Sequence, residues 1–189
     1  MGRGILTVSL IFVTGCTAHF PVNPPLQRYE PNHGYRLQNL GVPGNSGELL
    51  VVLTFSGGGT RSAALAYGVL EQLAATTITT GGRQRRLLDE VDVISAVSGG
   101  SFTAAYYGLY GDRIFQDFEE RFLTRNIDKG LTGQLFSPAN WARLVSARFS
   151  RSDLAALYYD KHIFDGKTFA DIAARKGPAI IINATDMSL

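Results

Sequence analysis

The chain has 189 residues, and its 18 lysines and arginines nearly balance its 16 aspartates and glutamates, for a formal net charge of +2. This length allows one domain with appendages, and an ordinary globular composition of 45% hydrophobic and 18% charged residues excludes a wholly disordered chain. The small charge argues against a nucleic-acid partner, while one Cys and three His exclude an intrachain disulfide and leave little material for a metal site.

The first fifteen residues are predicted to be a lipoprotein signal peptide (residues 1–15). The apolar run Ile5–Val13 is well short of the roughly 20 residues that a transmembrane helix needs. The sequence VTGC at 13–16 then resembles a bacterial lipobox, which implies cleavage before Cys16 and lipidation of that Cys. This predicts a lipid-anchored protein of the bacterial cell envelope, and Thr17 favours the outer membrane. The alternative is an ordinary signal peptide with an incidental Cys.

Residues 16–47 are predicted to form a tether. They hold five of the seven prolines in the chain together with several glycines, a composition that favours extended conformations. Such a segment would hold a domain away from a bilayer. The alternative is a strap that lies on the domain surface through Phe20, Tyr29 and Tyr35.

The domain is predicted to span 48–189 and to alternate strands with helices. Leu49–Phe55 is a continuous apolar run typical of a strand buried on both faces. A helix with apolar positions Leu65, Val69, Leu70 and Leu73 follows over 62–75, and a loop over 81–86 precedes a second strand, Val91–Val97. Further helices are predicted at 98–110, 112–125, 138–149, 152–159 and 167–175, and a third strand at 178–183. This alternation predicts an α/β fold with a parallel sheet.

The first strand is followed by a glycine-rich turn, Ser56–Arg61. Gly57, Gly58 and Gly59 leave backbone N–H groups uncovered at the start of a helix, where they can bind a phosphate or a developing oxyanion. A Walker loop needs Gly-Lys-Ser/Thr after its glycines, and a dinucleotide fingerprint needs a third Gly where Ser62 stands. A nucleotide-binding module is therefore disfavoured.

The second strand runs into Ser98, with small residues on both sides. A strand, a Ser and then a helix are typical of a nucleophile elbow, and here Ala96 and Gly100 occupy the positions that must be small. The glycine turn one unit upstream would supply an oxyanion hole. An N-cap role is the alternative for Ser98. Ser46 and Ser101 fit the elbow pattern less well.

Together the two turns, Ser56–Arg61 and Val97–Ser101, resemble those of the patatin-like phospholipase family. The resemblance implies a three-layer, parallel-sheet fold related to α/β-hydrolases, and a lipid acyl hydrolase that uses a Ser/Asp dyad without a cofactor or metal. The phospholipase or esterase would act on lipid or phospholipid substrates. The residues that the resemblance assigns are the nucleophile Ser98, the oxyanion-hole residues Gly57, Gly58 and Gly59, the loop-supporting Thr60 and Arg61, and the elbow residues Ala96, Gly99 and Gly100.

The Asp of the dyad is the missing part of this pattern. The family has it in a downstream Asp-Gly-Gly or Asp-Gly-Ala motif, whereas Asp165-Gly166 is the only Asp-Gly dipeptide here. We interpret Asp165 as a turn residue, with a dyad role as the alternative, and expect the chain to be an N-terminal portion of a longer protein. The segment that begins at Asn183 resembles one that shapes the family's site, and His162 is disfavoured as a base.

Two functional alternatives are carried forward. The first is a catalytically inactive envelope lipoprotein that uses the same scaffold to bind lipid or a partner. The second concerns Phe115, Phe118 and Phe122, which share one predicted helical face: they are expected to be core residues, and an acyl-chain wall is the alternative.

Overall fold

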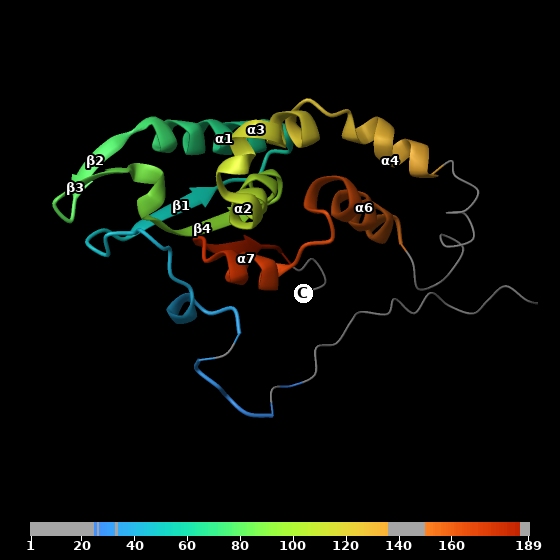
Figure 1. Cartoon of the computed structure of the whole chain (residues 1–189). Helices are drawn as coiled ribbons and strands as arrows, with labels where there is room; N and C mark the ends of the chain where they lie inside the picture. Colours follow the sequence, from blue (N-terminus) through green and yellow to red (C-terminus); the bar gives the residue numbers. More distant parts are fainter. Residues whose placement is uncertain (1–24, 26, 33, 136–149, 186–189) are drawn as a thin grey trace, which may run out of the picture.

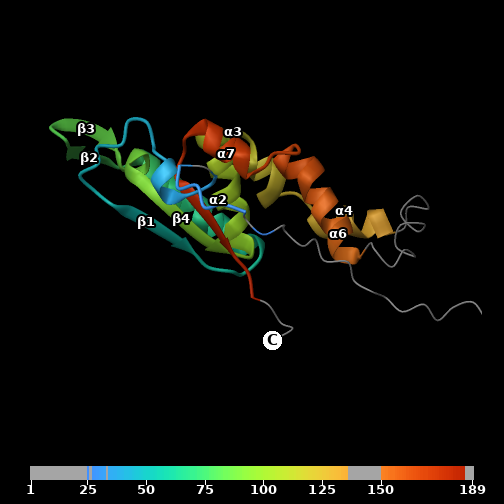
Figure 2. The ribbon, with the colours of Figure 1, turned by 90° about the horizontal axis from the view of Figure 1, so that it is seen from below.

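The computed structural model describes residues 25, 27–32, 34–135 and 150–185. At its centre is a parallel three-stranded sheet in the order β1-β4-β5, with helices packed against it (Figures 1 and 2). The strands are β1 (Val51–Phe55), β4 (Val91–Val97) and β5 (Ala179–Asn183). The predicted α/β fold with a parallel sheet is therefore confirmed.

The helices α1 (Thr60–Ala75) and α2 (Gly99–Tyr110) follow β1 and β4 directly. Helix α2 packs against all three strands, and α1 packs against α2. Because β1 and β4 are parallel neighbours with Phe55 opposite Ala96, the turns that leave these two strands meet at the same edge of the sheet. The close approach of α2 to β5 depends on Gly108, since a Cβ there would lie 2.6 Å from Cγ1 of Ile180.

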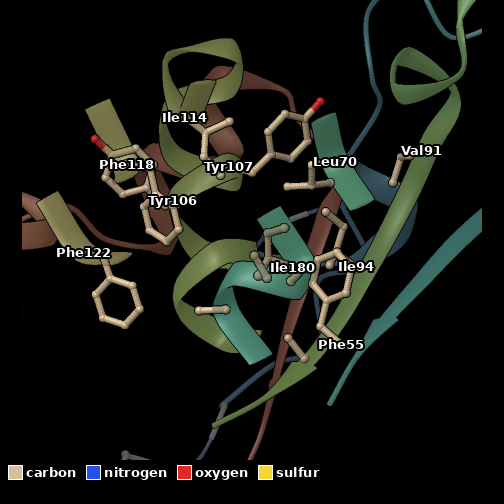
Figure 3. Packing of buried hydrophobic residues seen from close by; sticks show 14 of the residues in the cluster. Phe55, Leu70, Val91, Ile94, Tyr106, Tyr107, Ile114, Phe118, Phe122 and Ile180 are labelled. Atoms are coloured by element: carbon tan, nitrogen blue, oxygen red, sulfur yellow. The ribbon is translucent and has the colours of Figure 1, made fainter. Parts of the chain in front are cut away.

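The core lies between α1, α2 and the sheet (Figure 3). Leu70, Ile94 and Ile180 are almost fully buried there, and the aromatic rings of Tyr106 and Phe118 extend the cluster toward α3. Helix α1 contributes Ala63, Ala66 and Leu70, whereas Leu65 is 69% exposed. The predicted apolar face of this helix is therefore correct at Leu70 and wrong at Leu65, because the small alanines face the core instead.

The prediction that β1 is buried on both faces is wrong. It is an outer strand of the described sheet, and Val52 is 49% exposed. The other outer strand, β5, likewise leaves Ile181 and Ile182 exposed. Of the three strands only the central strand β4 is covered along most of its length, and its bounds are those predicted.

A β-hairpin replaces the predicted loop at 81–86. Strands β2 (Thr77–Thr80) and β3 (Arg83–Arg86) pair antiparallel around Gly81 and Gly82. Both glycines have positive φ, 57° and 67°, as a two-residue hairpin turn that follows the twist of the strands requires. The Gly-Gly dipeptide between two four-residue segments was the sequence signal for this hairpin.

The remaining elements are short helical segments, of which η3, α3 and α7 contact α2. The predicted helix 112–125 is divided into a 3-10 turn, an α-helical turn and a π-helical turn, and the predicted helix 138–149 lies outside the described residues. None of the described helices has the length and apolar character to cross a membrane. These elements are η1 (Leu37–Asn39), η2 (Leu87–Glu90), η3 (Gly111–Arg113), α3 (Ile114–Phe118), η4 (Glu119–Leu123), α4 (Ile127–Leu135), α6 (Arg151–Tyr159), η5 (Asp160–Phe164) and α7 (Phe169–Arg175).

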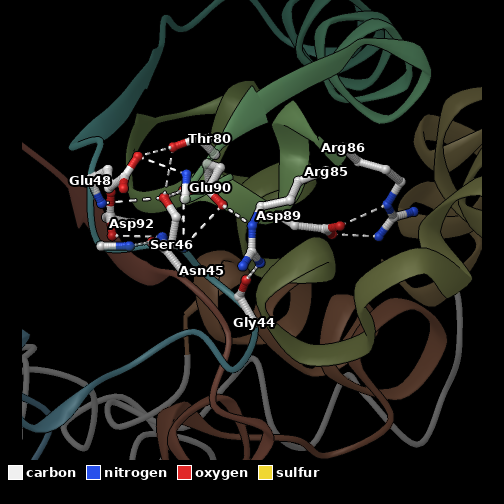
Figure 4. Close-up of polar contacts among 12 residues, drawn as sticks. Gly44, Asn45, Ser46, Glu48, Thr80, Arg85, Arg86, Asp89, Glu90 and Asp92 are labelled. Carbon is white, nitrogen blue, oxygen red and sulfur yellow. Dashed lines mark hydrogen bonds and ion pairs between the residues drawn. The ribbon is translucent and has the colours of Figure 1, made fainter. Parts of the chain in front are cut away.

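The segment before β1 is attached to the domain at two places. Tyr35 packs edge-on against Phe169, with 5.1 Å between ring centroids, and its hydroxyl accepts a hydrogen bond from the N–H of Ile180 at 2.6 Å. Ser46 donates from its backbone N–H and its hydroxyl to the fully buried carboxylate of Glu90 (Figure 4). The strap alternative is therefore supported at Tyr35, whereas Tyr29 is 65% exposed and Phe20 lies outside the described residues. The predicted signal peptide and Cys16 also lie outside them, and the boundaries at 15 and 47 stay predictions.

The carboxylates at this junction are each held by donors from a different part of the chain. Glu48 accepts from the Thr80 hydroxyl at 2.9 Å and from the N–H of Gly81 at 2.7 Å, and the hydrogen bonds lower the pKa of Glu48. Asp92 accepts from the N–H of Val51 at 2.8 Å. These bonds join the start of β1 to β4 and to the hairpin, and so fix where the glycine turn begins.

Candidate active site

Ser98 lies on a strained turn between β4 and α2. Its φ of 53° and ψ of −123° are rare for a residue with a side chain and require support from the surrounding structure. The Ser98 side chain makes no capping hydrogen bond to the helix that follows. A strand, a strained serine and a helix are the arrangement expected of a nucleophile elbow. Ser98 occupies the N-cap position of α2, but its hydroxyl does not cap the helix, so the N-cap alternative does not account for the side chain.

The glycine turn after β1 lies directly against this elbow. A Cβ placed on Gly57 would be 3.2 Å from Cβ and 3.7 Å from Oγ of Ser98. On the other side, a Cβ on Gly99 would collide with the carbonyl oxygen of Gly59, and one on Gly100 would be 2.8 Å from the carbonyl oxygen of Ser56. The structure thus brings the two predicted turns together, and the absence of side chains is what allows their backbones to touch.

The conformation of the glycine turn explains its residues. Gly58 and Gly59 have φ values of 141° and 65°, which residues with side chains rarely adopt. The Ser62 hydroxyl donates a hydrogen bond to the carbonyl of Ser56 and so closes the turn. Sequence reasoning missed Ser62, although a hydroxyl in the first helical turn after a glycine loop is a recognisable signal for this kind of bond.

Thr60 and Arg61, which were predicted to support the glycine turn, lie in different surroundings. Thr60 begins α1 and lines the cavity described below. Arg61 is exposed, and among the described residues no hydrogen bond joins its side chain to the turn. The Ser62 bond takes the place that was expected of Arg61, whose role in supporting the loop stays a prediction.

On the other side of the elbow, β5 fixes the end of β4. Ala96 is almost fully buried, opposite Phe55 in the register. The side-chain amide of Asn183 donates to the carbonyl of Ala96 at 3.1 Å and to Oγ of Ser95 at 2.9 Å. Asn183 therefore holds the last residues before Ser98, in agreement with the expectation that the segment beginning there shapes the site.

Ser98 opens onto a cavity of about 570 Å³. Three aromatic rings form one side of it: Phe102 stacks on Phe122 with 4.4 Å between centroids and meets Tyr159 at 4.7 Å. The described residues that line the cavity are Gly59, Thr60, Ser98, Gly99, Phe102, Phe122, Thr124, Arg125, Asn126, Ile127 and Tyr159. A cavity of this size, lined by aromatic rings and by polar side chains, is typical of a small-molecule site.

The three phenylalanines on the predicted helical face divide between core and cavity. Phe118 is fully buried in the core, and Phe115 packs against the core at its edge. Phe122 is 4% exposed and also lines the cavity. The core prediction is thus confirmed for Phe118, while Phe122 serves both the core and the cavity wall.

The residues lining the cavity include no base for Ser98 within the described part of the chain. No Asp, Glu or His is among them, and the described His, Cys, Asp and Glu residues form no group of three that could hold a metal ion. His162 lies outside the cavity in η5. Burial, together with the charges of Arg125 and Lys161, lowers the pKa of His162 below its usual value of 6.5.

Asp165 is a turn residue, as expected. It ends η5 in the left-handed conformation, with φ of 54°, and its carboxylate accepts from Arg121 at 2.9 Å and from the Tyr110 hydroxyl at 3.0 Å. Partial burial works to raise the pKa of Asp165, but these two hydrogen bonds outweigh it and lower the pKa below 3.8. These contacts engage the carboxylate away from the cavity, which argues against the dyad alternative.

Replacing Gly100 tests the contact between the two turns. A Cβ at this position would lie 2.7 Å from Cβ of Phe55 and 2.8 Å from a backbone oxygen, neither of which can move alone. We expect Gly100→Ala to lower the free energy of unfolding by about 1–3 kcal/mol, measured by urea denaturation. Gly68→Ala in α1, where a Cβ meets no atom within 4 Å, is the control and should be neutral or stabilising. Equal stability of the two variants would contradict the contact.

Asp165→Asn tests the turn. Asn keeps the left-handed conformation but loses the charge, and since the Asp165 side chain is 39% exposed we expect a loss of about 1 kcal/mol at pH 7. Because the folded-state pKa is lowered, this stabilisation is present above pH 3.8 and disappears as the pH falls through the folded value. Thermal unfolding from pH 7 to pH 2 measures it, with Asp160→Asn as control. Loss of ester hydrolysis at unchanged stability would instead make Asp165 the base.

Comparison with known proteins gives the family. The family model described as patatin-like phospholipase matches residues 53–187, more than half of the chain, from β1 through both turns to the end of β5. No curated protein and no solved structure matches the chain. The matched region contains β4, β5, all of β1 but its first two residues, and the meeting point of the glycine turn with Ser98. The chain belongs to the patatin-like phospholipase family.

Proposed function

We propose that this protein is a serine-dependent lipid acyl hydrolase in which Ser98 is the nucleophile. The observation that carries the proposal is the position of Ser98: exposed on a strained turn, uncapped, at the cavity and in contact with the glycine turn. Strained backbone at a cavity is typical of groups held ready for chemistry. Membership of the patatin-like phospholipase family supports lipid esters as the substrates.

In this proposal the Ser98 oxygen attacks the ester carbonyl while a base takes its proton. The backbone N–H groups of Gly57, Gly58 and Gly59 then stabilise the negative charge on the tetrahedral intermediate, which in other enzymes is worth about 3–4 kcal/mol for a single donor. The intermediate collapses to an acyl-enzyme with release of the alcohol, and water completes the cycle. Because no carboxylate or imidazole among the described residues lines the cavity, we assign the base to an Asp outside the described part.

The aromatic side of the cavity suits the acyl part of such a substrate. Phe102, Phe122 and Tyr159 present ring faces and edges next to Ser98, and burial of each methylene of an acyl chain against them is worth roughly 0.8 kcal/mol. Ester cleavage at Ser98 with the acyl chain on this wall places the alcohol part toward Thr124, Arg125 and Asn126.

A fluorophosphonate probe tests the nucleophile. We expect the protein to be labelled and Ser98→Ala to abolish labelling and to lower hydrolysis of p-nitrophenyl butyrate by about 1000-fold or more. Ser101→Ala, three residues further along α2, is the matched control, because the Ser101 hydroxyl is buried and makes no hydrogen bond among the described residues. A folded protein that includes the downstream Asp and is still not labelled by the probe would contradict the proposal and support the lipid-binding or partner-binding alternative.

We further propose that Cys16 carries a lipid anchor and that the protein resides in the bacterial cell envelope, at the outer membrane. The motif at 13–16 and the apolar run before it support this. Cells grown with radioactive palmitate should incorporate label into the protein, and Cys16→Ser should abolish incorporation and release the protein from the membrane fraction. Thr17→Ser is the control and should leave incorporation unchanged. Labelling that survives Cys16→Ser would contradict the anchor.

A further inference from the structure

The cavity beside Ser98 carries a single charged side chain among its described lining residues, that of Arg125. Arg125 lies between η4 and α4, and its neighbours Thr124 and Asn126 also line the cavity; these three residues are called the polar rim. The aromatic residues that line the cavity are largely apolar, whereas the rim is polar. Among the described lining residues the guanidinium of Arg125 is thus the one charged group that a substrate would meet.

The Arg125 side chain is held in place by uncharged groups. Nη2 of Arg125 donates to Nδ1 of His162 at 3.3 Å, and its guanidinium carbon is 5.9 Å from the ring centroid of Tyr158. The Tyr158 and His162 rings are themselves in contact, with 4.5 Å between centroids. His162 accepts this bond as the neutral imidazole, and its lowered pKa is consistent with that state at neutral pH.

Several arginines of the domain pair with carboxylates and, among the described residues, Arg125 does not; it differs from other arginines without such a pair, such as Arg61 and Arg83, in that it lines the cavity. The arginines that pair with carboxylates do so at Arg85–Glu90, Arg86–Asp89, Arg86–Asp112, Arg113–Asp117, Arg121–Asp117 and Arg121–Asp165. Within the described ranges no carboxylate pairs with Arg125. Among the described residues, neighbouring groups thus hold the Arg125 guanidinium in place, and no carboxylate neutralises its charge. A guanidinium of this kind is a strong donor to phosphate or carboxylate oxygens.

We propose that Arg125 determines substrate specificity by binding a phosphodiester of net negative charge in the alcohol part of the ester cleaved at Ser98. The inference rests on the proposed function, since it assumes ester cleavage in this cavity. The acyl chain lies on the aromatic wall and the anionic group lies at the rim, on Arg125 with Thr124 and Asn126 as neutral hydrogen-bonding neighbours. Esters with a net negative charge are thereby preferred to zwitterionic or neutral esters of the same acyl chain.

Hydrolysis of short-chain esters below their aggregation concentrations tests the preference without a membrane surface. The substrates are dihexanoyl phosphatidylglycerol, dihexanoyl phosphatidylcholine and the neutral p-nitrophenyl hexanoate. We expect Arg125→Gln to lower kcat/KM for the anionic ester by about 10-fold and for the neutral ester by less than about 3-fold. Arg125→Lys keeps the charge without the fork of donors and should fall between the two.

The matched control is Arg83→Gln, which changes the net charge equally. Arg83 is exposed on β3, and the hairpin lies at the opposite end of the molecule from α4 (Figure 1). This variant should keep the wild-type ratio of anionic to neutral hydrolysis. An equal loss for the anionic and neutral esters in Arg125→Gln, or a wild type that hydrolyses dihexanoyl phosphatidylglycerol no faster than dihexanoyl phosphatidylcholine, would overturn the role of Arg125 while leaving the hydrolase proposal intact.

A binding measurement separates this inference from catalysis. Calorimetry with Ser98→Ala and a non-hydrolysable dihexyl ether analogue of phosphatidylglycerol measures binding in the absence of catalysis. We expect Arg125→Gln, added to this variant, to weaken binding by about 10-fold. Unchanged affinity, or no binding to Ser98→Ala, would overturn the inference. If the wild type hydrolyses no ester but binding still depends on Arg125, the proposed chemistry is overturned and the anion-binding site is kept.

Discussion

The site depends on a close contact between two backbone segments at positions where glycine leaves no side chain between them. Gly99 and Gly100 at the start of α2 press against Phe55, Ser56 and Gly59 of the turn after β1, so closely that a single added carbon would collide with main-chain atoms. Protein interiors do not yield easily to such a collision. The contact fixes the distance between the Ser98 hydroxyl and the glycine turn, and it does so with rigid backbone. The strained φ of Ser98 persists because both sides of the turn are held in this way.

The parallel sheet makes this contact possible. Adjacent parallel strands end at the same edge, and the register of β1 with β4 sets Phe55 beside Ala96, one step before each chain turns into its helix. Strand β5 adds a third element, since Asn183 hydrogen-bonds to the last residues of β4. Each of the three strands therefore contributes to the position of one serine. The polar junction around Glu90 and Asp92 secures the opposite ends of β1 and β4.

The parts of the fold that the sequence predicts well are those whose cause is local. Strand β4 is rich in valine and isoleucine, and both turns are marked by glycines, so their places follow from the residues themselves. Strand β1 has an equally apolar run, yet it lies at the edge of the described sheet with Val52 half exposed, because burial depends on neighbours that a single segment does not specify. Leu65 was misplaced for the same reason.

The cavity wall could not be predicted, because it is assembled from distant segments. Phe102, Phe122 and Tyr159 come from three different helical elements, and Arg125 meets His162 across 37 positions of the chain. No spacing in the sequence encodes these meetings. They arise where the π-helical turns η4 and η5 pack against each other, and π-helical turns, which are rare, often occur at functional sites.

The hydroxyl of Tyr35 has a consequence for association between molecules. Strand β5 ends the described sheet, and an outer strand offers its free amides as a template for another chain. The amide of Ile180 is already occupied by the Tyr35 oxygen, and the phenol ring lies against Phe169 beside it. The segment that leads into the domain thus shields part of this edge and discourages intermolecular strand addition, so that one aromatic side chain contributes to keeping neighbouring copies apart.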